Sequence, residues 1–201
     1  MMLVAHSLWL LCAVMAMSVA TLSYDTKDLR LSVTSFDGGS RLKKSFASAR
    51  DLPAEPETLT MEPDDVIKLA FFASLSSGEK ATGESLPHQA WVVMDDEDAS
   101  RTSIWPLQVR GSSSSASWSL RVDRLSPNLK RKIVEAGPNH PFRLTLILAS
   151  FAKDPQSTID PLTLPLLDVQ FSQSMLSRFE SQKVPSARYE AELADGFHPQ
   201  P

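Results

Sequence analysis

Short stretches of alternating apolar and polar residues run along most of the chain and predict β-strands. In segment 28–36, Leu29, Leu31 and Val33 lie on one face and polar side chains lie on the other. This two-residue period is typical of a strand with one buried face. Segment 65–75 is apolar on both faces, which is typical of a strand in the middle of a sheet. The first two apolar segments therefore predict β-strands.

Further segments of the same kind follow: 88–95, 117–122, 142–151 and 162–171. Pro165, inside the last of them, favours an edge or a bulge, because proline lacks the amide proton that a ladder uses. Turn-forming residues separate these strands, and no glycine-rich strand–helix repeat is present. Such a series of short strands is typical of a sandwich. The sequence predicts an all-β, antiparallel, immunoglobulin-like β-sandwich with one short helix.

That helix is predicted over 126–137. Ser126 suits the N-cap, Pro127 the first helical position and Gly137 the C-terminal stop. After Phe171 the apolar pattern fades and the chain becomes polar, with several prolines. We interpret residues 173–201 as a polar tail and residues 21–172 as the sandwich domain.

The first twenty residues contain no Asp, Glu, Lys or Arg. An apolar run from Leu8 to Ala20 ends in the small residues that signal peptidase accepts. The run is shorter than the about 20 residues that a bilayer span requires. We predict a signal peptide over 1–20, cleaved between Ala20 and Thr21, and hence entry into the secretory pathway.

Charge and cysteine content narrow the classes of function. The 201-residue chain has a formal net charge of -4, and its basic stretches at 41–44 and 130–132 are short. Nucleic-acid binding requires clustered Lys and Arg, so no nucleic-acid partner is predicted. The single cysteine, Cys12, lies in the predicted signal peptide. The mature chain therefore has no disulfide, cysteine nucleophile or cysteine-based zinc site.

Catalytic motifs are absent, and the residues that remain as candidates are few. No two histidines lie at helical ligand spacing, and His140 is expected in an exposed turn. Asp96 and Asp98 form an Asp-x-Asp, which is able to hold a divalent cation with a nucleotide sugar. An acidic cluster after a strand is more typical of a solvated turn, and Arg101 stands where a calcium loop needs glycine. We predict no catalytic, cofactor or metal site.

The tryptophans of the mature chain offer a different kind of site. Trp91, Trp105 and Trp118 are able to stack on sugars, although an indole in such a strand more often fills the core. Trp91 differs because its strand is apolar on both faces, and Val93 lies on its side. The second face is available to another protein. We predict an interface formed by His88, Gln89, Trp91 and Val93.

The order of several stretches resembles the lumenal domain of the ribophorin II family, a subunit of oligosaccharyltransferase. These are DLRLSVTS, LPHQAWVVMDDED, SWSLRV, the Pro-Asn-Leu helix, FRLTLILASF and LPLLDVQF, and together they cover about 29–171. The most specific is Pro-His-Gln-Ala at 87–90, entering an aromatic and aliphatic strand. The resemblance implies that this stretch belongs to the sandwich framework, with His88 hydrogen-bonded to a neighbouring loop.

The resemblance also implies a function. The chain would be a non-catalytic subunit of the endoplasmic-reticulum complex, partnered by the other subunits, including the multi-spanning subunit that transfers the glycan. Family members associate with the membrane through C-terminal helices, and none follows here up to Pro201. We expect a truncated or frameshifted gene model or a shortened splice form, which would be lumenal-soluble or secreted. The alternative interpretation is a secreted carbohydrate-binding β-sandwich.

Overall fold

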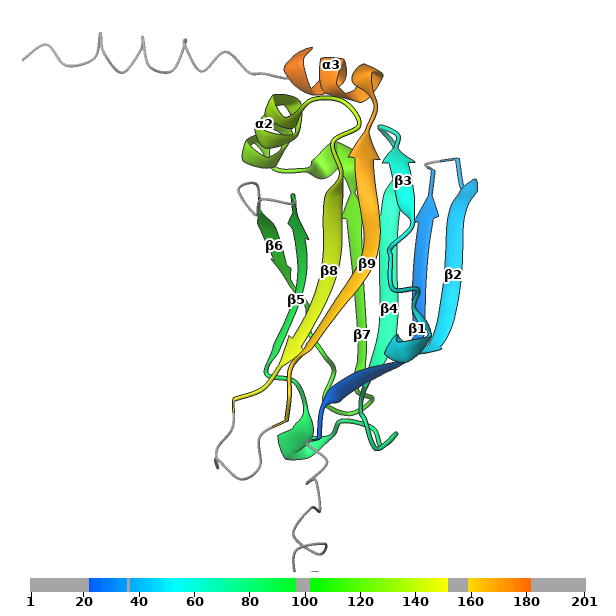
Figure 1. Ribbon diagram of the computed structural model, residues 1–201, viewed down its shortest axis with the longest axis vertical. Helices are drawn as coiled ribbons and strands as arrows, with labels where there is room; N and C mark the ends of the chain where they lie inside the picture. Colours follow the sequence, from blue (N-terminus) through cyan, green and yellow to red (C-terminus); the bar gives the residue numbers. More distant parts are fainter. Residues whose placement is uncertain (1–21, 36, 97–101, 152–158, 182–201) are drawn as a thin grey trace, which may run out of the picture.

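The computed structural model describes residues 22–35, 37–96, 102–151 and 159–181. They form two β-sheets packed face to face, with two α-helices at one end (Figure 1). The predicted all-β sandwich is confirmed. The predicted signal peptide, with its cleavage position between Ala20 and Thr21, lies outside the described residues.

The four-stranded sheet has the order β2-β1-β4-β7, and all its neighbouring strands are antiparallel. These strands are β2 (Ser40–Ser48), β1 (Tyr24–Thr34), β4 (Val66–Leu75) and β7 (Ser115–Arg121). β2 escapes the sequence pattern because it is an edge strand in which only Leu42 is buried. The other three fall on predicted segments, although β1 starts four residues before the predicted strand.

The five-stranded sheet has the order β3-β9-β8-β5-β6. These strands are β3 (Thr58–Met61), β9 (Leu162–Phe171), β8 (Phe142–Ala149), β5 (Gln89–Asp95) and β6 (Ser103–Pro106). The predicted antiparallel arrangement is wrong at one edge, because β3 pairs with β9 in parallel. The chain leaves β2 at the lower end in Figure 1 and crosses back through β3 to the upper end, where β4 begins. β9 runs in the same direction as β3.

A bulge accommodates the proline in β9. β9 lies between β3 and β8, and its register against β8 shifts where Thr145 faces Pro165. Because proline donates no amide hydrogen bond, the irregularity occurs where the ladder is already broken. The prediction of an edge or bulge at Pro165 is confirmed as a bulge.

The helix α2 (Pro127–Ala136) confirms the predicted one, with the expected caps. The Leu129 amide donates to the Ser126 hydroxyl at 3.3 Å, and Gly137 has a φ of 87° beyond the last turn. Only glycine adopts that backbone conformation without strain. Leu129 and Ile133 lie on the buried face of the helix.

A second helix, α3 (Gln173–Ser181), begins two residues after β9. It buries Met175, Leu176 and Phe179, and Figure 1 shows it beside α2 at the upper end of the sandwich. The ring centroids of Phe179 and Phe171 are 6.3 Å apart. The Lys130 ammonium lies 5.4 Å from the centroid of the Phe179 ring. The interpretation of 173–201 as a polar tail is therefore wrong for residues 173–181. Residues beyond 181 lie outside the described part. No helix in the described part is long and apolar enough to cross a membrane.

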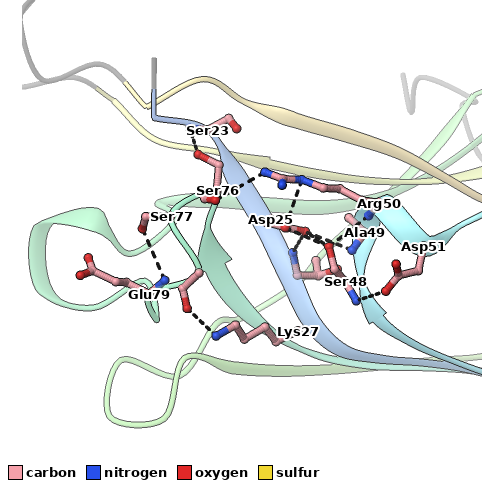
Figure 2. Close-up of polar contacts among 12 residues, drawn as sticks. Ser23, Asp25, Lys27, Ser48, Ala49, Arg50, Asp51, Ser76, Ser77 and Glu79 are labelled. Carbon is pink, nitrogen blue, oxygen red and sulfur yellow. Dashed lines mark hydrogen bonds and ion pairs between the residues drawn. The ribbon is translucent and has the colours of Figure 1, made fainter. Parts of the chain in front are cut away.

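A hydrogen-bonded cluster around Asp25 anchors the start of β1 (Figure 2). The Asp25 carboxylate accepts from the Ala49 amide at 3.0 Å and from the Ser48 hydroxyl at 3.0 and 3.2 Å. Arg50 lies 3.8 Å from the same carboxylate and donates to the Ser76 carbonyl at 3.5 Å. These contacts join β1 to the end of β2 and to the turn after β4.

A β-bulge follows this anchored end. Lys27 pairs with Phe72 and Arg30 pairs with Ala70, so two residues of β1 oppose one residue of β4. Asp28 within the bulge has a φ of 49°. The bulge changes the alternation, so that Thr26 and Leu29 both face the core. Arg30 then lies on the outer face of the four-stranded sheet.

The packing of α3 predicts that its apolar face stabilises the fold. Phe179→Ala removes a ring that is 5% exposed, and a change of this kind costs about 3 kcal/mol. Urea unfolding of the protein measures the loss of stability. The exposed neighbour Glu180 provides the control, since Glu180→Ala should leave the unfolding midpoint unchanged. Equal midpoints for both variants and the wild type would show that this helix does not pack on the domain.

Candidate functional site

β5 places three of the four predicted interface residues on its outer side, and the fourth, His88, just before the strand. Its inner side buries Ala90, Val92 and Met94 in the core. Its outer side carries Gln89, Trp91, Val93 and Asp95, all half-buried. The structure therefore confirms the prediction that Ala90, Val92 and Met94 lie on one side of the strand and Trp91 and Val93 on the other. His88 precedes the strand and is exposed.

The strand register surrounds Trp91 and Val93 with apolar neighbours. Trp91 faces Pro106 of β6 and Ile147 of β8, whereas Val93 faces Ile104 of β6 and Thr145 of β8. Residues directly opposite on antiparallel strands share a face of the sheet. Ile104, on the edge strand β6, is 57% exposed. We name these residues the apolar face: Trp91, Val93, Ile104, Pro106, Thr145 and Ile147.

Polar groups border one end of the apolar face. The His88 Nδ1 atom lies 2.6 Å from the Ser150 hydroxyl, at the point where β5 begins and β8 ends. The His88 ring centroid is 6.5 Å from that of Phe151, which is 68% exposed. The expectation that His88 hydrogen-bonds a neighbouring segment matches this contact.

Charged residues border the other end. The Arg143 guanidinium binds Asp168 through two hydrogen bonds of 2.9 and 3.1 Å, and Arg143 faces Asp95 across the strand pair. Burial raises the pKa of Asp95 above its usual value. The Arg143 charge works in the opposite direction, and the Asp96 charge adds to the rise.

Asp96 is not in a solvated turn, contrary to the prediction. It is 4% exposed, and its carboxylate lies 3.9 Å from the His140 Nε2 atom. His140 also packs edge-on against Phe142, with ring centroids 5.2 Å apart, so it is not an idle turn residue. Asp98, the other half of the proposed cation motif, lies outside the described residues.

A hollow of about 340 Å³ lies at this charged end of the sheet. Its lining includes Asp95, Asp96, Asp168 and Arg143. The bidentate guanidinium occupies the oxygens of Asp168, and within the described ranges no group of three or more acids, histidines or cysteines is arranged to hold a metal ion. The cluster is therefore a salt-bridged border of the apolar face.

The other two tryptophans lie between the sheets. Trp105 of β6 and Trp118 of β7 are partly buried against the core, and their ring centroids are 5.7 Å apart. They pack across the edge where the two sheets are open, which agrees with the core interpretation of these indoles. Trp91 alone among the three projects from the outer face. Sequence reasoning missed Ile104, because its strand is only four residues long.

The raised pKa of Asp95 predicts a pH-dependent effect of neutralising it. The folded state holds the Asp95 proton more tightly than the unfolded chain, so stability is lost as pH rises from the unfolded pKa through the folded pKa. The free energy of unfolding of Asp95→Asn, relative to the wild type, should therefore be higher at about pH 7 than at about pH 3. Urea unfolding at both pH values measures the difference.

Asp123 serves as the control of opposite sign. Its hydrogen bonds with Arg121 lower the pKa of the Asp123 carboxyl, so its stabilisation is present above the unfolded pKa and lost as pH falls. Asp123→Asn should be destabilising at neutral pH and less so in acid. A relative stability of Asp95→Asn that does not change between the two pH values would contradict the role of burial.

Comparison with known proteins adds no relative: no protein-family model matches the chain, and no curated protein is significantly similar to it.

Proposed function

We propose that this protein is a non-catalytic accessory subunit of the endoplasmic-reticulum oligosaccharyltransferase, of the ribophorin II type. It supports N-linked glycosylation through lumenal contacts with other subunits. The observation that carries this proposal is the apolar face around Trp91. The resemblance in the order of the strand and helix stretches indicates the complex.

The composition of the apolar face favours a protein partner. An indole at the centre of a flat apolar surface is a frequent anchor of protein–protein interfaces. Trp91 has Pro106 and Ile147 as its direct neighbours, and the exposed Ile104 extends the surface to the edge strand. His88 at one end and the Arg143–Asp168 pair at the other provide a polar border, as at the rim of an interface.

The shape of the surface also favours this function. It lies on strands, with side chains held by cross-strand pairing, and such rigid surfaces lose little entropy on binding. A partner with a complementary apolar surface, such as another lumenal domain of the complex, would cover it. In this proposal the multi-spanning subunit performs the transfer, and no residue of this chain is catalytic. In the family that the chain resembles, the C-terminal region is the part that contacts the membrane.

A secreted carbohydrate-binding protein is the alternative that the same surface supports. The half-exposed Trp91 ring would then stack on a sugar. Trp105 and Trp118 do not contribute, because they pack against each other. Subunit assembly and secretion distinguish the two functions.

The proposal predicts that a charge on the apolar face prevents assembly. The tagged full chain is expressed in cells, recovered from microsomes in mild detergent and examined by mass spectrometry. The wild type should recover the catalytic subunit in near-equal amount, and Trp91→Glu should reduce that recovery at least ~10-fold.

Ser119→Glu is the matched control. Ser119 is exposed on the outer face of β7, in the opposite sheet, so the same charge there should leave assembly unchanged. Circular dichroism melting of both variants separates lost binding from lost folding. Unchanged recovery with a folded Trp91→Glu protein would contradict this interface. The alternative would instead be supported if the wild-type protein were found alone in the medium and if the purified protein bound an oligosaccharide array.

A further inference from the structure

The outer face of the four-stranded sheet has a different character from the apolar face. A hollow of about 420 Å³ lies on it, over β1, β4 and β7. Its floor is made of small residues, Ala70, Ser115 and Ser117. Arg30 and Arg110 stand at its sides. Small side chains at neighbouring positions in two strands, β4 and β7, leave the sheet surface open there, so the sheet itself forms the bottom of the hollow.

The strand register fixes how far Arg30 lies from β7, on the other side of the hollow. Ser117 pairs with Ala70, and Ala70 pairs with Arg30, so Arg30 lies two strands away from the floor at β7. Neighbouring strands are about 4.8 Å apart, which separates these positions by roughly 10 Å. Arg110 is held beside β7, where its amide donates to the Ser115 carbonyl at 2.9 Å and its carbonyl accepts from the Ser114 amide at 2.7 Å. Arg110 is therefore about one strand spacing farther from Arg30, roughly 15 Å in all, a distance that two extended arginine side chains can bridge with one ligand between them.

A second hollow of about 440 Å³ adjoins the first. Arg30 and Asp28 line both, and Lys43 lines the second. Arg30 therefore stands between two depressions on the same sheet face. The bulge at Asp28, which follows the cluster drawn in Figure 2, places Arg30 there.

The cations of this face have no acidic partner. Neither Arg30 nor Arg110 nor Lys43 forms an ion pair with another described residue. Several other arginines are paired, as in Arg41–Asp65, Arg121–Asp123 and Arg143–Asp168. Of the residues that line the two hollows, Asp28 is the one acid, and it is exposed. The chain is acidic overall, so this local excess of positive charge is a feature of the face.

We propose that the hollow between Arg30 and Arg110 binds a phosphate ester carried on a hydroxyl-rich group, such as a sugar phosphate or an inositol headgroup. A guanidinium binds phosphate oxygens through parallel hydrogen bonds. Ser115, Ser117 and Gln108 offer donors and acceptors to hydroxyl groups. The volume is within the range of small-ligand sites. This site lies on the opposite sheet from the apolar face and does not depend on the proposed subunit function.

Phe72 completes the arrangement. It lines the hollow from β4, and the Lys80 ammonium lies 5.8 Å from its ring centroid. An aromatic ring packs against the C–H face of a sugar or inositol ring, and Lys80 adds a further positive charge beside it. The lining thus combines an anion site, hydroxyl partners and one flat apolar wall.

Titration calorimetry on the mature full-length chain at low ionic strength tests the proposal. The soluble probes are mannose 6-phosphate, mannose and inorganic phosphate. We expect mannose 6-phosphate to bind at least ~10-fold more tightly than either of the others, because only it has both kinds of group. Vesicles of phosphatidylcholine, with and without a phosphatidylinositol phosphate, test the lipid source. Binding to the soluble ester, to the vesicles with phosphoinositide, or to both supports the shared chemistry and identifies the source.

Variants locate the site. Arg30→Ala and Arg110→Ala should each weaken binding at least ~10-fold, since each removes a charge-assisted contact. Asp28→Asn should tighten binding, because it removes the one acid at the rim. Arg124→Ala is the matched control: Arg124 is an exposed arginine in the short helix after β7, away from the hollow, and its loss should change nothing. Lack of binding to every phosphate probe at millimolar concentration, or equal loss in Arg124→Ala and Arg30→Ala, would overturn the proposal.

Discussion

The burial of two apolar sheet faces against each other is the interaction on which this structure depends. The described residues contain no cysteine, so no disulfide joins the two sheets there. Leu29, Leu31, Leu144 and Leu146 are almost completely buried and come from both sheets. Hydrophobic stabilisation grows with the apolar area removed from water, so a domain without cross-links needs a large continuous core. The outer faces are free to differ because they do not contribute to it.

Two bulges preserve the inner faces where the sequence would interrupt them. The bulge at Asp28 allows Thr26 and Leu29 to face the core on both sides of an irregular step. The bulge opposite Thr145 accommodates Pro165, which has no amide proton to donate to the ladder. The first bulge also shapes the outer face, because it places Arg30 between two hollows.

The outer faces divide the proposed functions between them. One is apolar, with a central indole and charged borders, and such a surface gains free energy when a protein covers it. The other has small residues at its centre and unpaired cations at its sides, and such a surface recognises an anion with polar attachments. Because the two sheets pack against each other through their inner faces, their outer faces point in opposite directions (Figure 1). A subunit bound through the apolar face would keep its basic face open.

Local pattern was sufficient for the features that depend on neighbours in the chain. The alternation along 88–95 correctly separated Ala90, Val92 and Met94 from Trp91 and Val93. Ser126 and Gly137 marked the ends of α2, since capping involves only adjacent residues. The edge strands β2 and β3 and the helix α3 were missed. Each has few apolar residues, and packing against distant elements stabilises it more than its own pattern does.

Residues distant in the chain meet only through the strand register and the packing of the ends of the sandwich. Ile104 lies beside Val93, and Arg30 stands across a hollow from Arg110, because antiparallel pairing places them there. Asp96 is buried beside His140, although its neighbours in sequence are acids that favour solvent. A period of two tells which face of a strand a residue occupies, and it does not tell which strand lies alongside. The sequence therefore predicted the sandwich and the orientation of Trp91, and tertiary pairing assembled both surfaces.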